Sequence, residues 1–296
     1  GALYGPRVFP SGAVISQTAG HGDMRMPHEA NPLHGGGNAY MSMDFGILAD
    51  GVDAHLTAVR ENLKNGATQI KIMGGGGVMS DYDPIHSLQP SPAEIRAAVQ
   101  AASDWGTYVL AHAYTAEAIT RLAENGVKSI EHGLLIDDKA AKLVKEKGAV
   151  ISTQLYIFRQ LLVSDYMTDF QKEKAQLVRA GQENLIRLIR KYDITTGFST
   201  DFIFGEYAAL PLEFTERALF WSNAEVLRQA TSEGGEIIRL AGKLNRHGNF
   251  GEIREGWVAD LLLHNGEILE DLSILADPDT NLALIMKSGE IIKNRP

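Results

Sequence analysis

The 296-residue sequence contains no cysteine, which excludes disulfides and thiolate metal sites. Its formal charge of −9 argues against a nucleic-acid-binding surface. No apolar run approaches the roughly 20 residues that span a bilayer, so we expect no membrane partner. Internal repeats and low-complexity segments are also absent. Because 44% of the residues are hydrophobic and 22% are charged, the composition indicates a well-packed core.

One predicted strand, residues 69–73, carries a lysine between apolar residues. Side chains alternate along a strand, so Ile70 and Ile72 share one face and Lys71 lies on the other. If helices cover a parallel sheet there, Lys71 points into the interior. An unpaired ammonium in such a place is costly. Lys71 therefore needs an ionic partner, a lowered pKa or a chemical modification.

Strands alternate with helices of ten or more residues, which indicates βα units and a parallel sheet. Capping boxes at Ser91–Glu94 and Ser222–Glu225 predict two helix starts. Residues 17–45 are predicted to form a long irregular loop, and such loops are usually functional or disordered. The six predicted barrel strands lie near residues 8 (Arg7-Val8-Phe9), 70, 109, 129, 151 and 197. Three further strands, 258–264, 282–287 and 291–293, form a small β appendage with a hairpin turn at Ser288-Gly289.

Four of the predicted strands carry a polar residue at the C-terminal end, namely Lys71, His112, His132 and Asp201. In a (β/α)₈ barrel, side chains at this end of several strands build the active site. Two histidines, an aspartate and a lysine suit a site for divalent metals. Each residue alone has an ordinary explanation as a packing histidine, a helix N-cap or a solvated lysine. Four such residues at corresponding strand ends are much less frequent by chance.

The motifs around these four residues resemble those of the amidohydrolase superfamily. Lys71 precedes Gly74–Gly77, His112 lies in Leu-Ala-His-Ala-Tyr-Thr, His132 in Ile-Glu-His-Gly and Asp201 in Phe-Ser-Thr-Asp. The tail 251–261 is similar to the closing β-sandwich signature of that superfamily. Residues 5–7 and 17–23 match its imidazolonepropionase-like and Xaa-Pro dipeptidase-like branch. The resemblance covers nearly the whole chain.

The resemblance implies an α/β fold, a (β/α)₈ TIM-type barrel of which strands 3–8 are present, with a small β-sandwich appendage at the C-terminus. Residues 1–250 would form a partial metal-dependent hydrolase barrel, and residues 251–296 the C-terminal part of a composite β-sandwich. The first barrel strand of the family carries His-x-His, which does not occur here. We therefore expect a partner, either an N-terminal segment or a second chain, that carries His-x-His. As written, the six strands are not expected to close a barrel or to fold stably alone.

The chain starts at Gly1, which looks like an internal point of a longer protein. A fragment, a cleaved product and one chain of a split enzyme all fit this start. The cellular location stays open for the same reason, with the cytoplasm favoured. A homo-oligomer is expected.

The resemblance also implies a binuclear site with two divalent metal ions, expected to be zinc. Carbon dioxide would convert Lys71 to a carbamate that bridges both metals. His112 and His132 would hold the second metal. Asp201 would bind the first metal and act as general base and then general acid. The implied reaction is hydrolysis of an amide or peptide bond.

A dipeptidase or an N-acyl amino acid hydrolase acting on a small molecule or dipeptide is the expected enzyme. By the same resemblance, His21 and Tyr114 would bind a substrate carboxylate, with Arg159 as a weaker candidate. A solvent-exposed histidine and a packing tyrosine are the ordinary explanations of the first two. Residues 74–77 do not form a phosphate loop, since no Gly-Lys-Ser/Thr follows, and are predicted to be a mobile rim loop.

Two other functions remain open. The first is a cyclic-amide hydrolase of the imidazolonepropionase or hydantoinase type, although Lys71 speaks against a mononuclear imidazolonepropionase. The second is a non-catalytic remnant without the His-x-His ligands. The intact Lys71, His112, His132 and Asp201 speak against a remnant.

Overall fold

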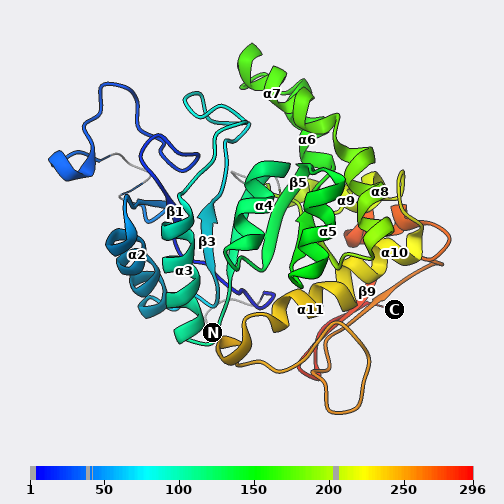
Figure 1. Ribbon diagram of the computed structural model, residues 1–296. Coiled ribbons are helices and arrows are strands. Elements are labelled where there is room, and N and C mark those ends of the chain that lie inside the picture. The colour runs from blue at the N-terminus through cyan, green and yellow to red at the C-terminus, as the bar shows by residue number, and fades with distance from the viewer. Residues whose placement is uncertain (1–4, 38–40, 42, 203–206, 296) are drawn as a thin grey trace.

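The computed structural model describes residues 5–37, 41, 43–202 and 207–295 (Figure 1). Seven parallel strands form one sheet in the order β2-β1-β3-β4-β5-β6-β7. The predicted α/β fold with a parallel sheet is therefore confirmed, whereas closure into a barrel stays a prediction. The strands are β1 (Val14–Ser16), β2 (Gly46–Leu48), β3 (Ile70–Met73), β4 (Val109–Thr115), β5 (Ser129–Leu135), β6 (Val150–Thr153) and β7 (Thr196–Phe198).

The first predicted strand, Arg7-Val8-Phe9, is wrong. This segment is irregular, and the side chain of Val8 is 73% exposed. The strand begins five residues after Phe9, at β1, where Ile15 is fully buried and pairs with Ile72 of β3. The sheet also contains β2, which the sequence did not predict because its three residues follow directly on the irregular loop.

Two helices start where the sequence predicts a helix start. Both predicted capping boxes are present, at the start of α3 and of α10. Residues 156–192 contain three helices, and the first ends at Val163 with Ser164 as its C-cap. The helices of the sheet region are α2 (Val52–Lys64), α3 (Pro92–Asp104), α4 (Ala116–Glu124), α5 (Asp138–Glu146), α6 (Tyr156–Val163), α7 (Asp169–Arg179), α8 (Gln182–Tyr192), α9 (Leu212–Arg217), α10 (Asn223–Arg228) and α11 (Gly234–Arg239). Within the described part of the chain, no helix combines the length and apolar character that a membrane span needs.

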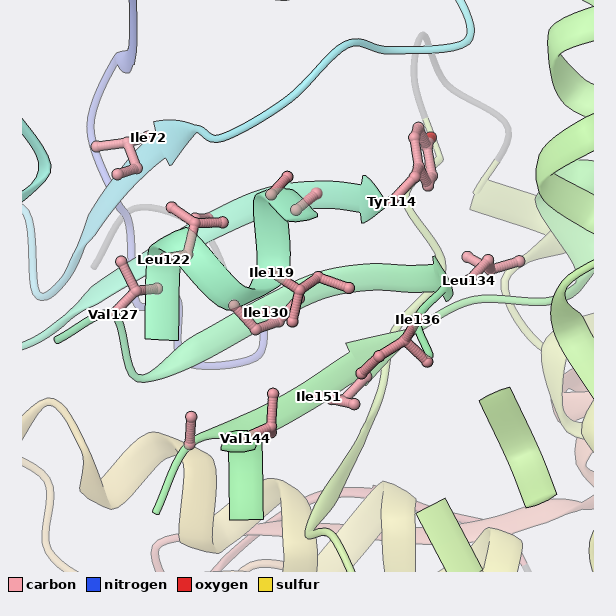
Figure 2. Close-up of a cluster of buried hydrophobic side chains, with 14 of the residues drawn as sticks. Ile72, Tyr114, Ile119, Leu122, Val127, Ile130, Leu134, Ile136, Val144 and Ile151 are labelled. Carbon is pink, nitrogen blue, oxygen red and sulfur yellow. The ribbon is translucent and has the colours of Figure 1, made fainter. Parts of the chain in front are cut away.

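One face of the sheet packs against helices through aliphatic side chains. Ile72 of β3, Ile130 of β5 and Ile151 of β6 lie on this face and are fully buried. Figure 2 shows them in the same cluster as Ile119 and Leu122 of α4. Burying such a side chain contributes about 1.5–3 kcal/mol. This outer face therefore supplies much of the stability that holds the strand ends in place.

The opposite, inner face of the sheet is polar and less buried. Lys71, Leu110 and Glu131 lie on it, and each is only half-buried. Lys71 is in register with Leu110, and Glu131 is in register with His112. Because paired residues of neighbouring strands point to the same side, these four side chains face one another across the inner surface.

A separate antiparallel sheet is formed by β8 (Leu261–His264), β9 (Leu282–Lys287) and β10 (Glu290–Asn294). The predicted turn between the last two strands is confirmed, with φ of +52° at Ser288 and +82° at Gly289. Positive φ at both central residues is the pattern of a type I′ hairpin. The division into units 1–250 and 251–296 stays a prediction.

The N-terminal segment is tied to this small sheet. The guanidinium of Arg7 donates to the carboxylate of Asp260 and to the hydroxyl of Ser288. Lys287 donates to the carbonyl of Gly5 over 2.5 Å. These bonds join residues more than 250 positions apart in the sequence.

Asp260→Asn is expected to weaken this tie. Burial raises the pKa of Asp260, but the bonds from Arg7 and from the amide of Ser288 hold the pKa below its usual 3.8. A carboxyl with a lowered folded-state pKa stabilises the fold above its unfolded-state pKa, and this contribution is lost as the pH falls through the folded-state value. We expect the variant to lose about 0.2–1 kcal/mol of unfolding free energy at pH 7 and to converge with wild type in acid.

Urea denaturation at pH 7 and in acid measures this difference in unfolding free energy between the variant and wild type. Asp138→Asn is the control, because Asp138 pairs with Lys191 on the surface. Equal losses in the two variants, or a loss for Asp260→Asn that persists in acid, would contradict the tie.

Candidate active site

Four aromatic side chains meet at the carboxyl ends of the central strands. The ring of His112 lies 4.5 Å from that of His132, 4.8 Å from that of Tyr114 and 4.3 Å from that of His21, measured between centroids. Asp201 approaches from the end of β7, with its Oδ2 atom 4.0 Å from Nδ1 of His132. Figure 2 shows Tyr114 at the carboxyl end of β4. The structure therefore brings together five of the six predicted site residues around one point.

His112 lies on the inner face of β4 and is only 2% exposed. Its Nε2 atom is 3.1 Å from the carbonyl oxygen of Gly76. Burial, together with the charges of His21, His132 and Lys71, lowers the pKa of His112 well below its usual value. The imidazole is therefore neutral, which is the form that binds metals.

His132 reaches the same site by a break in the strand pattern. Its neighbour Glu131 is in register with His112 and faces inward, so strict alternation would point His132 toward the helices. Instead, φ of His132 is +75°, and the pairing of β4 with β5 shifts register at this point. Bulges of this kind re-aim side chains next to active sites. Both Glu131 and His132 can thus face the site.

The orientation of the His132 ring is set by Gln154, which follows the last residue of β6. Nδ1 of His132 lies 2.9 Å from Oε1 of Gln154, so Nδ1 carries the proton and Nε2 is left with its lone pair. Burial is the main cause that lowers the pKa of His132 to about 4, although the nearby Asp201 opposes it. A second neutral imidazole is the result.

Lys71 and Glu131 occupy the inner surface beneath the histidines. Burial raises the pKa of Glu131, and the charge of Lys71 is the largest influence that opposes this rise. The hydroxyl of Ser129 also donates to Glu131 over 2.6 Å. Lys71 and Glu131 are therefore electrostatic neighbours, which agrees with an inward-facing Lys71.

Asp201 follows β7 and has φ of +54°. Non-glycine residues rarely adopt this conformation, which costs on the order of 1–3 kcal/mol and clusters at functional sites. Its side chain is 41% exposed, the most accessible of the five. Asp201 is thus held at the mouth of the cluster, where solvent or a ligand can reach it.

His21 is not the exposed loop residue of the ordinary interpretation. Its Nδ1 atom lies 2.8 Å from the hydroxyl of Ser80 and 3.3 Å from the carboxylate of Asp83, which leaves Nε2 free of these partners. The amide of Gly77 donates to the same carboxylate over 2.7 Å. A Cβ atom on Gly77 would lie 1.7 Å from Cε1 of His21. The ring therefore rests directly on the glycine backbone.

This contact corrects the prediction for residues 74–77. All four glycines are buried, so they form a packed platform rather than an exposed rim. Each of three glycines would bring an added Cβ within 2.5 Å of another atom, namely Gly74, Gly76 and Gly77. The run of glycines is needed because the backbone passes close to other groups there.

Arg159, the weaker carboxylate candidate, forms an ion pair of 2.9 Å with Glu216 of α9, and its side chain is 59% exposed. The sequence did not identify Gln154, Ser80 or Asp83 as site residues. Gln154 follows a strand directly, as the predicted polar residues do, and this signal could have found it. Ser80 and Asp83 lie in a loop and have no such signal.

The donor atoms fit a divalent metal in kind. Two neutral imidazoles, a carboxylate and an amine that can become a carbamate are ligands such an ion accepts. Among the described residues, however, no group of three or more histidine, aspartate or glutamate side chains is placed to hold a metal ion. His112, His132, Asp201 and Lys71 therefore remain predicted ligands.

Comparisons with known proteins identify the family of this chain and several relatives. The model of the amidohydrolase family matches residues 2–292. Ochratoxinase of Aspergillus niger is 29% identical over 302 residues, which cover 99% of this chain and 61% of that enzyme. The chain thus spans about three fifths of the length of this curated relative.

Solved structures show the same similarity. A prolidase in complex with N-methylphosphonate-L-proline is 36% identical with a TM-score of 0.90, covering 100% of this chain and 71% of the other. A Xaa-Pro dipeptidase with bound methionine in its active site is 27% identical with a TM-score of 0.84, covering 99% and 70%.

Gly77→Ala tests whether the glycine platform seats His21. The added Cβ must displace the imidazole ring, since its three nearest atoms all belong to His21. We expect a loss of about 1–3 kcal/mol in unfolding free energy, as for other overpacked sites. A crystal structure of the variant should show the His21 ring moved away from His112.

Two comparisons make the result specific. Gly75→Ala is the matched control, because its Cβ would meet only ordinary contacts at 3.4 and 3.5 Å. In a His21→Ala background, Gly77→Ala should cost much less, which a double-mutant cycle measures. Equal losses with and without the imidazole would show that His21 does not rest on Gly77.

Proposed function

This chain belongs to the amidohydrolase family, and we propose that it hydrolyses amide or peptide bonds at the site formed by His112, His132, Asp201 and Lys71. The observation that carries this proposal is the convergence of two buried histidines with Asp201 at the carboxyl ends of parallel strands. In barrel enzymes, residues from several strand ends build the active site. The prolidase, dipeptidase and ochratoxinase relatives support the same reaction class.

The residues proposed to hold two divalent metals, with zinc as the expected ion, are His112, His132, Asp201 and a carboxylated Lys71. Carboxylation would turn the lysine from a cation into an anion with two oxygens, which suits its place beside two histidines. When bound, the metals would polarise the scissile carbonyl and make water acidic enough to react near neutral pH.

Asp201 is the proposed proton carrier. Its carboxylate is the most accessible polar group of the cluster and lies 4.0 Å from His132. The left-handed backbone holds it toward the mouth of the site. There it would accept a proton from the attacking water and pass it to the departing amine.

The proposed substrate is a dipeptide or an N-acyl amino acid with a free carboxylate. The proline derivative in the prolidase relative carries such a group. Tyr114 is 4% exposed and lies beside both histidines. Burial raises the pKa of its hydroxyl well above the usual value, so the hydroxyl stays a hydrogen-bond donor near neutral pH. Tyr114 and Nε2 of His21 would anchor the carboxylate.

We also propose that ligands from a segment or chain carrying His-x-His complete the metal site. The described residues hold no group of three histidine or acidic side chains that could bind a metal by themselves. Metal analysis of the full-length protein tests this point. Two metals per chain would support the binuclear site, whereas a metal-free protein without hydrolytic activity would favour a non-catalytic remnant.

Asp201→Asn is expected to lower kcat by about 10²–10⁴-fold with little change in KM, because the amide keeps the shape but cannot accept the proton. Hydrolysis of a dipeptide by the full-length protein measures both constants. Asp193→Asn is the matched control, since Asp193 also has a positive φ but its side chain is 99% exposed on the surface. Near-normal turnover of Asp201→Asn would assign the base to another residue, with Glu131 as the next candidate.

Tyr114→Phe is expected to reduce the preference for a free carboxylate. A charge-assisted hydrogen bond contributes roughly 1.5–3 kcal/mol, so kcat/KM for a dipeptide should fall by about tenfold to a hundredfold. The C-terminal amide of the same dipeptide should be affected much less. Tyr108→Phe makes the same change at the opposite end of β4 and serves as the control. If wild type cleaves acid and amide equally, no carboxylate anchor exists.

A further inference from the structure

A buried ion pair on α9 bonds to the backbone of β6 and β7, whose ends lead to site residues. Glu213 and Arg217 are four residues apart on α9, and both side chains are completely buried. Nε of Arg217 donates to Oε1 of Glu213 over 2.7 Å. A fully buried arginine is unusual, so its remaining donors need partners.

The remaining N–H groups of Arg217 donate hydrogen bonds at the ends of two strands. Arg217 donates to the carbonyl oxygens of Thr153, the last residue of β6, and of Gly197 in β7, the latter over 3.1 Å. Its other nitrogen donates to Oε1 of Gln229 over 2.6 Å. The ladder between the two strands ends at the pair Thr153 and Phe198. The guanidinium thus bridges β6 and β7 where their backbone pairing stops.

Glu213 holds the next stretch of backbone. Its carboxylate accepts the amide hydrogens of Leu155, 3.1 Å from both oxygens, and of Tyr156, over 2.9 Å. These amides begin α6, where the first turn leaves donors without intrahelical partners. Between the carbonyl held by Arg217 and the amide held by Glu213 lies one residue, Gln154. The ion pair therefore hydrogen-bonds to the backbone on both sides of Gln154, the residue that bonds to His132.

We propose that the Glu213–Arg217 pair is a positioning device for the candidate active site. It fixes Gln154, which in turn fixes the protonated Nδ1 of His132, and it holds the end of β7 from which Asp201 emerges. The catalytic consequence rests on the proposed hydrolase function. The effect on the His132 hydrogen bond does not depend on that function.

Stability alone is a weak explanation for this pair. Replacing a buried ion pair with apolar side chains of similar volume is often neutral or stabilising, whereas removing one partner is strongly destabilising. Apolar side chains could fill the space, but they could not bond two carbonyls and two amides at chosen positions. The rings of Phe198 and Trp221, 4.8 and 5.4 Å from the guanidinium carbon, further fix its plane.

The test uses Arg217→Lys in the full-length, metal-loaded protein, together with Glu213→Leu/Arg217→Met as a pair without charge. Lysine keeps the buried charge but lacks the planar fork that joins both strands. Arg190→Met is the matched control, because Arg190 also bonds a glutamate, Glu225, and a backbone carbonyl, that of Phe220, but is half-exposed.

The first readout is the solvent exchange of the His132 Nδ1 proton, followed by NMR of protein labelled with ¹⁵N-histidine. We expect exchange at least tenfold faster in both Arg217 variants and in Gln154→Ala, and unchanged exchange in Arg190→Met. This readout needs no substrate. An unchanged exchange rate in a folded Arg217 variant would overturn the proposal whether or not the protein hydrolyses amides.

The second readout is kinetic. We expect kcat to fall by about 10–100-fold with KM within about threefold of wild type, which is the usual effect of losing groups that orient a ligand. In the Gln154→Ala background the further loss from Arg217→Lys should be smaller, because only the hydrogen bond to β7 is then left to lose. Equal losses of kcat in the wild-type and Gln154→Ala backgrounds would show that the pair has only a structural role. Losses of kcat that simply parallel the fall in melting temperature would show the same. A wild-type protein without hydrolytic activity would contradict the proposed function and leave the exchange measurement decisive.

Discussion

The left-handed backbone of His132 is the constraint on which the candidate site depends. Regular alternation along β5 would send either Glu131 or His132 away from the inner face. The positive φ and the register shift bring the imidazole back to within 4.5 Å of His112 without removing Glu131. Such a conformation costs free energy and persists only if its surroundings hold it. Gln154, which directly follows the neighbouring strand β6, provides one of those restraints.

Holding two histidines in a buried place requires that their polar atoms be satisfied. Nearby polar groups meet this requirement: a carbonyl oxygen for His112 and an amide oxygen for His132. The adjacent His21 has a hydroxyl and a carboxylate as its partners. None of these partners is a predicted ligand. The ring nitrogens outside these bonds, Nδ1 of His112 and Nε2 of His132 and of His21, are the ones that can reach a metal or a substrate. The orientation of the imidazole rings is therefore set by residues that are not themselves predicted ligands.

Much of the fold and the site could be predicted from the sequence, because the signals were local. Capping boxes marked the starts of α3 and α10, and polar residues at the carboxyl ends of predicted strands marked Lys71, His112, His132 and Asp201. The three-residue strands β1 and β2 were missed, since short runs beside a loop carry little periodicity. The inward turn of His132 could not be predicted, because it depends on a φ value. The roles of Asp83 and Arg217 depend on contacts across about 60 residues of sequence.

The two faces of the parallel sheet divide stability from chemistry. The outer face buries Ile72, Ile130 and Ile151 completely. Dispersion and apolar burial stabilise this packing, and neither requires a precise orientation of the side chains. The inner face carries Lys71 and Glu131, whose burial is unfavourable unless charges and hydrogen bonds compensate. A strand can hold both because its residues alternate. The apolar face can therefore support a polar face that would not be stable alone, and the strain at His132 and Asp201 is tolerated for the same reason.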